Sequence, residues 1–124
     1  MRPMQHLTAA LVALPLLIPV AHAADMKGAD IKTLLSGATG TGTTSRGSSY
    51  VGQYNADGTM SGSVADGKHT DTGTWRIVGD EYCSTWSKWR NGSEACFTVE
   101  ALGDDEYRFN EGGKGSTTLK ITKR

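Results

Sequence analysis

The chain has 124 residues, and its 13 Lys and Arg residues balance 13 Asp and Glu residues, so the formal net charge is zero at pH 7. This length allows one domain with one modest hydrophobic core. The neutral balance lacks the basic surface that binding to nucleic acid or to an anionic membrane requires, so neither partner is expected.

The N-terminal segment, residues 1–23, has the pattern of a secretory signal peptide. A short basic start precedes a nearly all-apolar run over residues 7–20, and Ala21-His22-Ala23 is a small-x-small cleavage site. The apolar run is shorter than the roughly 20 residues of a transmembrane helix, so an uncleaved membrane anchor is the less favoured alternative. We expect cleavage near Ala23 and a single β-barrel-like domain over residues 24–124, in the periplasm or secreted.

Residues 30–36 are predicted to form the one helix. Ile31, Leu34 and Leu35 fall on one apolar face, and Gly37 is a suitable stop. A helix this short is not stable alone. We therefore expect its aliphatic side chains to pack over an open end or face of the rest of the domain.

The remainder of the chain predicts an antiparallel β-meander. Turn dipeptides recur every nine to thirteen residues or so, with Thr, Val, Tyr and Trp between them. The predicted strands lie near residues 38–44, 49–55, 59–65, 70–78, 81–89, 94–101, 105–110 and 116–122. About seven or eight such strands must curl or close to hide their edges. The expected fold is all-β, a small barrel or a strongly bent sheet, with one short N-terminal helix and one disulfide.

Cys83 and Cys96 are the only cysteines, and two thiols behind an export signal predict one structural disulfide. Strand alternation places Tyr82 and Trp86 on one face and Cys83 on the other. The same alternation puts Cys96 on the polar face of the partner strand, with Phe97 on the apolar face. The sequence therefore predicts an aromatic interior with the disulfide across the outside, and Tyr82 opposite Phe97.

The disulfide and the turn signal between the cysteines disagree about strand register. A tight two-residue turn at Asn91-Gly92 would place the cysteines some four residues apart along the ladder, which is too far for a bond. Because the covalent constraint takes precedence, we expect a longer loop over residues 87–92. In that register, Trp86 faces Ser93.

The residue types in the chain give little support for catalysis. His69 is the single histidine beyond the predicted signal peptide, and both cysteines are expected to be paired. That excludes most histidine-based metal sites and any free thiol nucleophile. His69 near Asp66 and Asp71 is interpreted as a solvated loop residue, with a weak surface metal ligand as the alternative. We predict no catalytic residue, no metal site and no cofactor.

The aromatic residues supply the candidate binding positions. Strand alternation places Trp89 on the polar face, near a hairpin tip and beside Arg90. It is either an exposed interaction anchor or a side chain that folds back over the disulfide. Tyr50, Tyr54 and Trp86 complete the candidate set.

One family resemblance covers most of the chain beyond the signal peptide. Its elements are Tyr54, Asp57-Gly58-Thr59, Gly62, Gly73-Thr74-Trp75, Gly79-Asp80, Cys83, Trp86, Cys96 and the helical segment 31–37. The pattern resembles small exported proteobacterial domains of unknown function. This resemblance implies a periplasmic β fold and supplies no catalytic residue.

A second resemblance is local. Residues 89–95 are similar to one strand of bacterial periplasmic lysozyme inhibitors, which are small disulfide-linked β-barrels. Residues 45–50 depart from the Ser-Gly-x-x-Tyr inhibitory loop of those proteins in order and in position.

Two functions follow as expectations. The first is a non-enzymatic binding or interaction domain, whose partner is a small apolar ligand or an envelope protein, with the helix as a plug or gate of the cavity. The alternative is a protein inhibitor of an envelope-directed hydrolase such as lysozyme, acting through an exposed loop at residues 44–50 or 87–92.

Overall fold

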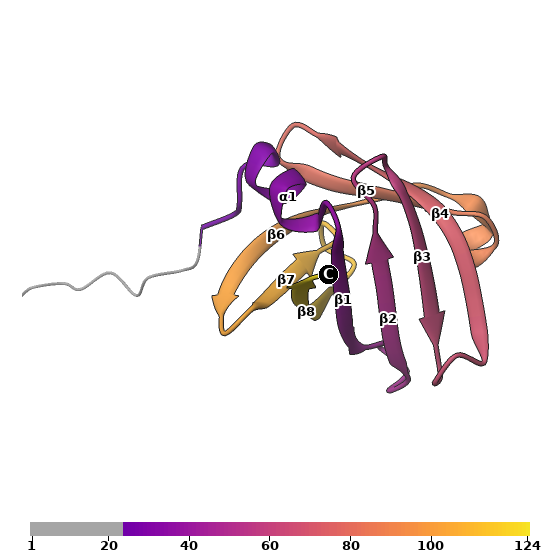
Figure 1. The fold of residues 1–124 in the computed structure, drawn as a ribbon. Coiled ribbons are helices and arrows are strands. Elements are labelled where there is room, and N and C mark those ends of the chain that lie inside the picture. The colour runs from indigo at the N-terminus through magenta and orange to yellow at the C-terminus, as the bar shows by residue number, and fades with distance from the viewer. Residues whose placement is uncertain (1–23) are drawn as a thin grey trace, which may run out of the picture.

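The computed structural model describes residues 24–124, so the predicted signal peptide lies outside the described residues. The chain forms a closed antiparallel barrel in which each strand pairs with the next and β8 returns to β1 (Figure 1). The elements are α1 (Gly28–Leu35), β1 (Ala38–Thr43), β2 (Ser49–Tyr54), β3 (Thr59–Val64), β4 (His69–Val78), β5 (Glu81–Trp86), η1 (Trp89–Gly92), β6 (Ala95–Gly103), β7 (Glu106–Asn110) and β8 (Ser116–Lys123). The predicted all-β barrel with one short N-terminal helix and one disulfide is confirmed.

The barrel interior follows from the alternation of side chains along each strand. Inward positions carry the buried aromatic and aliphatic residues, which are Tyr54, Met60, Trp75, Tyr82, Trp86, Val99, Phe109, Leu119 and Ile121. Tyr82 lies at the centre, with its ring 5.9 Å from that of Tyr54 and 5.6 Å from that of Phe109, both edge to face. The predicted aromatic interior is therefore present.

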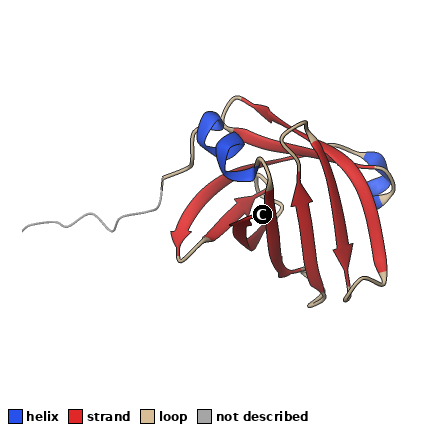
Figure 2. Cartoon of the chain, in the orientation of Figure 1, coloured by secondary structure: helices blue, strands red, loops and turns tan. Residues whose placement is uncertain are grey.

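Helix α1 closes one end of the barrel (Figures 1 and 2). Ile31 and Leu35 have no exposed surface and belong to the hydrophobic core, as expected for a short helix that packs over an open end. The helix begins two residues before its predicted start. No helix among residues 24–124 has the length and apolar character that a membrane crossing requires.

Polar contacts fix both ends of α1. The backbone N–H of Gly28 donates to Oδ1 of Asp80 at 2.8 Å, which places a carboxylate at the positive end of the helix dipole. A Cβ at Gly28 would lie 2.0 Å from the carbonyl oxygen of Gly79, so only glycine allows this close approach. At the other end, Nζ of Lys123 donates to the carbonyl oxygens of Thr33 and Ser36. The last strand and one turn therefore clamp the helix on the barrel.

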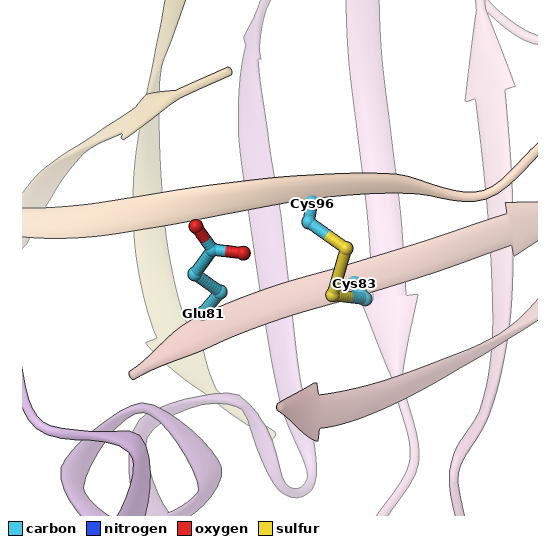
Figure 3. A group of neighbouring side chains, drawn as sticks. All are labelled: Glu81, Cys83 and Cys96. Atoms are coloured by element: carbon cyan, nitrogen blue, oxygen red, sulfur yellow. A yellow bond between two sulfur atoms is a disulfide. The ribbon is translucent and has the colours of Figure 1, made fainter. Parts of the chain in front are cut away.

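The disulfide joins β5 to β6 on the outer face of the barrel (Figure 3). Cys83 lies opposite Cys96 with their Cα atoms 4.0 Å apart, and Tyr82 lies opposite Phe97, which confirms the predicted register. Cys83 faces outward yet has no exposed surface. Its neighbour on β4, Arg76, forms two hydrogen bonds of 2.8 Å to the Glu94 carboxylate, and this ion pair crosses over β5.

The prediction for the end of this hairpin is wrong in detail. β5 ends at Trp86 rather than at residue 89, and the β5–β6 ladder pairs residues 82–84 with residues 95–97. Ser93 precedes β6, so it does not face Trp86 in the ladder. The predicted longer loop over residues 87–92 is present, because the chain leaves β5 after Trp86 and then passes over the barrel end.

Candidate functional site

The end of the barrel opposite α1, here called the mouth, is formed by turns and loops. These connections are residues 44–48, 65–68, 87–94 and 111–115, whereas the connections near α1 are residues 55–58, 79–80 and 104–105. Figure 2 shows α1 and the short segment η1 on opposite sides of the barrel. No helix among the described residues lies across the mouth in the way that α1 covers the other end.

A cavity of about 410 Å³ occupies the mouth side of the barrel interior. Its wall is formed by Thr43, Thr44, Ser45, Tyr50, Tyr54, Val64, Tyr82, Ser84, Trp86, Trp89, Arg90, Phe97, Phe109, Glu111, Thr117 and Leu119. Aromatic and aliphatic side chains dominate, and hydroxyl groups with two charged residues complete the wall. Volume and composition match those of small-molecule sites, which are concave, mostly apolar and supplied with a few polar groups.

All five candidate binding residues from the sequence line this single cavity. Tyr50 and Tyr54 come from β2, Trp86 from the end of β5, and Trp89 with Arg90 from η1. Tyr54 and Trp86 are buried, Tyr50 and Trp89 are half-buried, and Arg90 is exposed at the mouth. Residues that lie up to 40 positions apart in the chain, between Tyr50 and Arg90, are thus brought together by barrel closure.

The orientation of Trp89 differs from both sequence interpretations. Its ring packs against that of Trp86, with centroids 4.6 Å apart, inside the mouth rather than in solvent or over the disulfide. Strand parity does not apply to Trp89 because the strand has already ended. Gly62 on β3 makes room for this pair, since a Cβ there would lie 2.6 Å from the Trp86 ring and 2.9 Å from the Trp89 ring.

Asp71 on β4 fixes the loop that carries Trp89 and Arg90. Its Oδ2 accepts hydrogen bonds from the backbone N–H groups of Lys88 at 2.8 Å and Trp89 at 3.0 Å. Oδ1 accepts from the N–H of Thr72 at 2.8 Å. Burial alone would raise the pKa of this carboxyl, but the three backbone donors and the Lys88 charge outweigh it and hold the pKa below its ordinary value. Asp71 is therefore an ionised anchor of the mouth.

Arg90 turns its guanidinium inward from a left-handed backbone conformation. Its φ is 55°, and that of Asn91 is 54°, a region that residues with a Cβ rarely adopt. Nη2 donates to Oγ of Ser84 at 2.8 Å, and the guanidinium carbon lies 5.8 Å from the centre of the Phe97 ring. Ser84 is a buried inward residue of β5, so the cation reaches the cavity wall.

Three tyrosine hydroxyls lie at the bottom and side of the cavity. The hydroxyls of Tyr50 and Tyr54 are 3.2 Å apart, and the hydroxyl of Tyr82 donates to the Met60 sulfur at 3.5 Å. Burial is the main cause that raises the pKa of each tyrosine, and at Tyr50 the nearby Arg90 charge opposes it. These hydroxyls therefore stay protonated at neutral pH and act as hydrogen-bonding groups.

Two other places on the barrel differ from the cavity in their chemistry. A groove of about 440 Å³ lies on the outside of β2, β3 and β4, but its lining is mostly hydroxyl and amide groups. Glu81 lies beside the disulfide, with ligand atoms of the three residues within 4.8 Å (Figure 3). Because Cys83 and Cys96 are bonded to each other, they offer no thiolate to a metal ion.

Several residues of the site escaped the sequence analysis. From the sequence, Asp71 is named only as a neighbour of His69, although strand alternation places it on the inward face with Gly73 and Trp75, where a buried carboxylate is expected. Ser84 shares the inward face with Tyr82 and with Phe97, which was already predicted there, so alternation alone identifies Ser84 as a wall residue. Nothing in the sequence indicates that Arg90 turns into the barrel, since that depends on a left-handed loop.

Comparison with known proteins gives no match: no family model, no curated protein and no solved structure shows significant similarity to this chain. The resemblance to exported proteobacterial domains and the likeness to lysozyme inhibitors therefore stay predictions.

Proposed function

We propose that this protein is an exported, non-enzymatic binding domain that takes a small apolar molecule into the mouth of its barrel. The observation that carries the proposal is the cavity of about 410 Å³, walled mainly by aromatic and aliphatic side chains. Small-molecule sites commonly have volumes of roughly 300–1,000 Å³ and occur in the mouths of β-barrels.

The construction of the two barrel ends supports the same function. Ile31 and Leu35 fill the end at α1, whereas the cavity lies at the mouth, where a ligand would enter. Tyr54 and Tyr82 form the bottom of the cavity and also belong to the core. A bound apolar molecule would continue this core toward the mouth and remove the half-buried rings of Tyr50 and Trp89 from water.

The lining of the cavity favours binding over catalysis. Among the described residues that form the wall there is no histidine and no free cysteine, and the tyrosine hydroxyls are protonated. A disulfide that bridges two strands fits an oxidising compartment, as the predicted signal peptide does. Both features support a location in the periplasm or outside the cell.

A pair of adjacent substitutions tests the cavity. Thr117 lines the cavity, whereas Thr118 points outward from the same strand and is exposed. Thr117→Trp is expected to fill the cavity and to weaken binding of 1-anilinonaphthalene-8-sulfonate, measured by its fluorescence, at least tenfold. Thr118→Trp, the matched control, is expected to bind like the unaltered protein.

Native mass spectrometry supplies the second test. Protein purified from its own periplasm is expected to carry a co-purifying small molecule that is lost in the Thr117→Trp variant. If the unaltered protein carries nothing and binds no apolar probe, or if both tryptophan variants bind equally, the proposal is wrong.

The hydrolase-inhibitor alternative receives less support from the loops at the mouth. The loop over residues 87–92 is exposed except at Trp89, but it is held against the barrel, because Trp89 packs on Trp86 and Arg90 donates to Ser84. Inhibition of lysozyme stays a prediction, and a direct assay of the purified protein against lysozyme tests it.

A further inference from the structure

We propose that the molecule bound in the cavity is an apolar monocarboxylate, whose anionic head is held by the Arg90 guanidinium. This inference rests on the proposed function, because it names the class of ligand that the same cavity takes. The wall of this largely apolar cavity holds one cation, Arg90.

The Arg90 guanidinium has a fixed position, and Nη2 is its one nitrogen with a hydrogen-bond partner among residues 24–124. It contacts Ser84 through Nη2 alone, at 2.8 Å to Oγ and 3.4 Å to the carbonyl oxygen. No carboxylate of residues 24–124 lies within ion-pair distance of it. A guanidinium carries five N–H donors in a planar fork that matches the two oxygens of a carboxylate. Donors therefore remain for a ligand.

The surrounding structure fixes this cation at the cavity, where Arg90 is exposed at the mouth. Asp71 fixes the two residues that precede Arg90 through their backbone N–H groups. The left-handed backbone at Arg90 and Asn91 then turns the side chain toward Ser84 and Phe97. The aromatic ring beneath the cation and the serine beside it fix the guanidinium in a site whose remaining wall is largely apolar.

The charges of the wall disfavour a dianion. Glu111 also lines the cavity, so the lining holds one cation and one anion. A phosphate dianion would meet the Glu111 carboxylate without a second cation to balance it. An uncharged ligand would cover the guanidinium and leave its N–H groups without an anionic acceptor, which is unfavourable for a buried donor. The two oxygens of a single carboxylate can accept hydrogen bonds from the guanidinium. The Arg90 charge also acts on the nearby Tyr50 hydroxyl, whose pKa burial raises and this charge lowers.

A matched pair of probes distinguishes the contribution of the anionic head to binding from that of the apolar body. 4-Butylbenzoate and 4-butylbenzyl alcohol share one apolar body and differ in charge. Isothermal titration calorimetry at pH 7.5 is expected to show that the unaltered protein binds the benzoate about tenfold or more tightly than the alcohol. Arg90→Gln is expected to abolish this preference and to leave binding of the alcohol within about twofold of the unaltered protein.

Lys88→Gln is the charge-matched control, since Lys88 lies on the same loop but does not line the cavity. It is expected to keep the preference for the benzoate. Equal binding of the two probes by the unaltered protein, or an equal loss of both in Arg90→Gln, would overturn the carboxylate assignment and leave the proposed function standing. If neither probe binds to the unaltered protein, the failure lies with the proposed function itself.

Discussion

The two ends of this barrel are built from different interactions. At the α1 end, aliphatic side chains without exposed surface fill the opening, and Leu35 is typical of them. At the mouth, half-buried rings surround a cavity, and hydrogen bonds to Asp71 hold the loop in place. Apolar burial scales with area and stabilises the whole fold, whereas a few hydrogen bonds fix local geometry. The closed end should therefore carry stability, and the mouth should carry binding.

The largest effect on stability is expected from Leu35→Ala at the closed end. Removing a fully buried leucine side chain leaves a cavity and costs about 2–5 kcal/mol in the free energy of unfolding. Urea denaturation followed by tryptophan fluorescence measures it. Folded Leu35→Ala protein should still bind the apolar probe, because Leu35 does not line the mouth cavity.

Thr33→Ala is the control for this variant, since Thr33 is exposed on the same helix. Its free energy of unfolding should change by no more than about 0.5 kcal/mol. Similar losses in the two variants, or loss of probe binding from folded Leu35→Ala protein, would contradict the division of roles between the two ends.

The disulfide lies between the two ends, and its removal is expected to have the next largest effect. Cys83 and Cys96 are 13 residues apart, and a closed loop of this size stabilises a fold by about 3 kcal/mol on the loop-entropy model. The effect should concentrate at the β5–β6 seam, where the ladder runs over residues 82–84 and 95–97.

The double variant Cys83→Ala, Cys96→Ala tests this with urea denaturation and amide hydrogen exchange. Faster exchange is expected in β5 and β6, with β1 and β2 less affected in the folded state. Reduction of the unaltered protein with dithiothreitol should give the same loss. Unchanged stability in both experiments would mean that packing alone holds the seam.

Much of the fold could be predicted because its causes are local in the sequence. Glycine-containing turns mark the strand ends, and alternation assigns the faces. The disulfide sets the β5–β6 register because only one alignment brings Cys83 and Cys96 together. The helix followed from the spacing of Ile31, Leu34 and Leu35.

The arrangement at the mouth could not be predicted, because contacts between distant segments determine it. Alternation fails for Trp89 once the strand ends at Trp86. The inward turn of Arg90 requires two left-handed residues in succession, without a glycine at either position to signal it. Asp71 and the two amide groups that it binds are 17 and 18 residues apart in sequence. Candidate residues could therefore be named individually, but not the cavity that they form.

The smallest effect on global stability is expected from Asp71→Ala, which should instead loosen the mouth. The substitution leaves the backbone N–H groups of Lys88 and Trp89 without their acceptor. Amide exchange should become faster over residues 87–92, and tryptophan emission should shift to the red as Trp89 separates from Trp86. Asp57→Ala, in a turn at the closed end, should leave both readouts unchanged.

Acid should produce the same loosening in the unaltered protein. The pKa of Asp71 is lowered in the folded state, so the folded loop favours the ionised carboxylate. Its stabilisation is complete above the ordinary value of 3.8 and is lost as the pH falls through the lowered pKa. A red shift of tryptophan emission is therefore expected only at pH values below the ordinary carboxyl range. Asp57→Ala should retain this transition, whereas Asp71→Ala should show the red-shifted emission at every pH. A transition that persists in Asp71→Ala would assign the acid sensitivity to another carboxyl and remove Asp71 from its role as the anchor of the mouth.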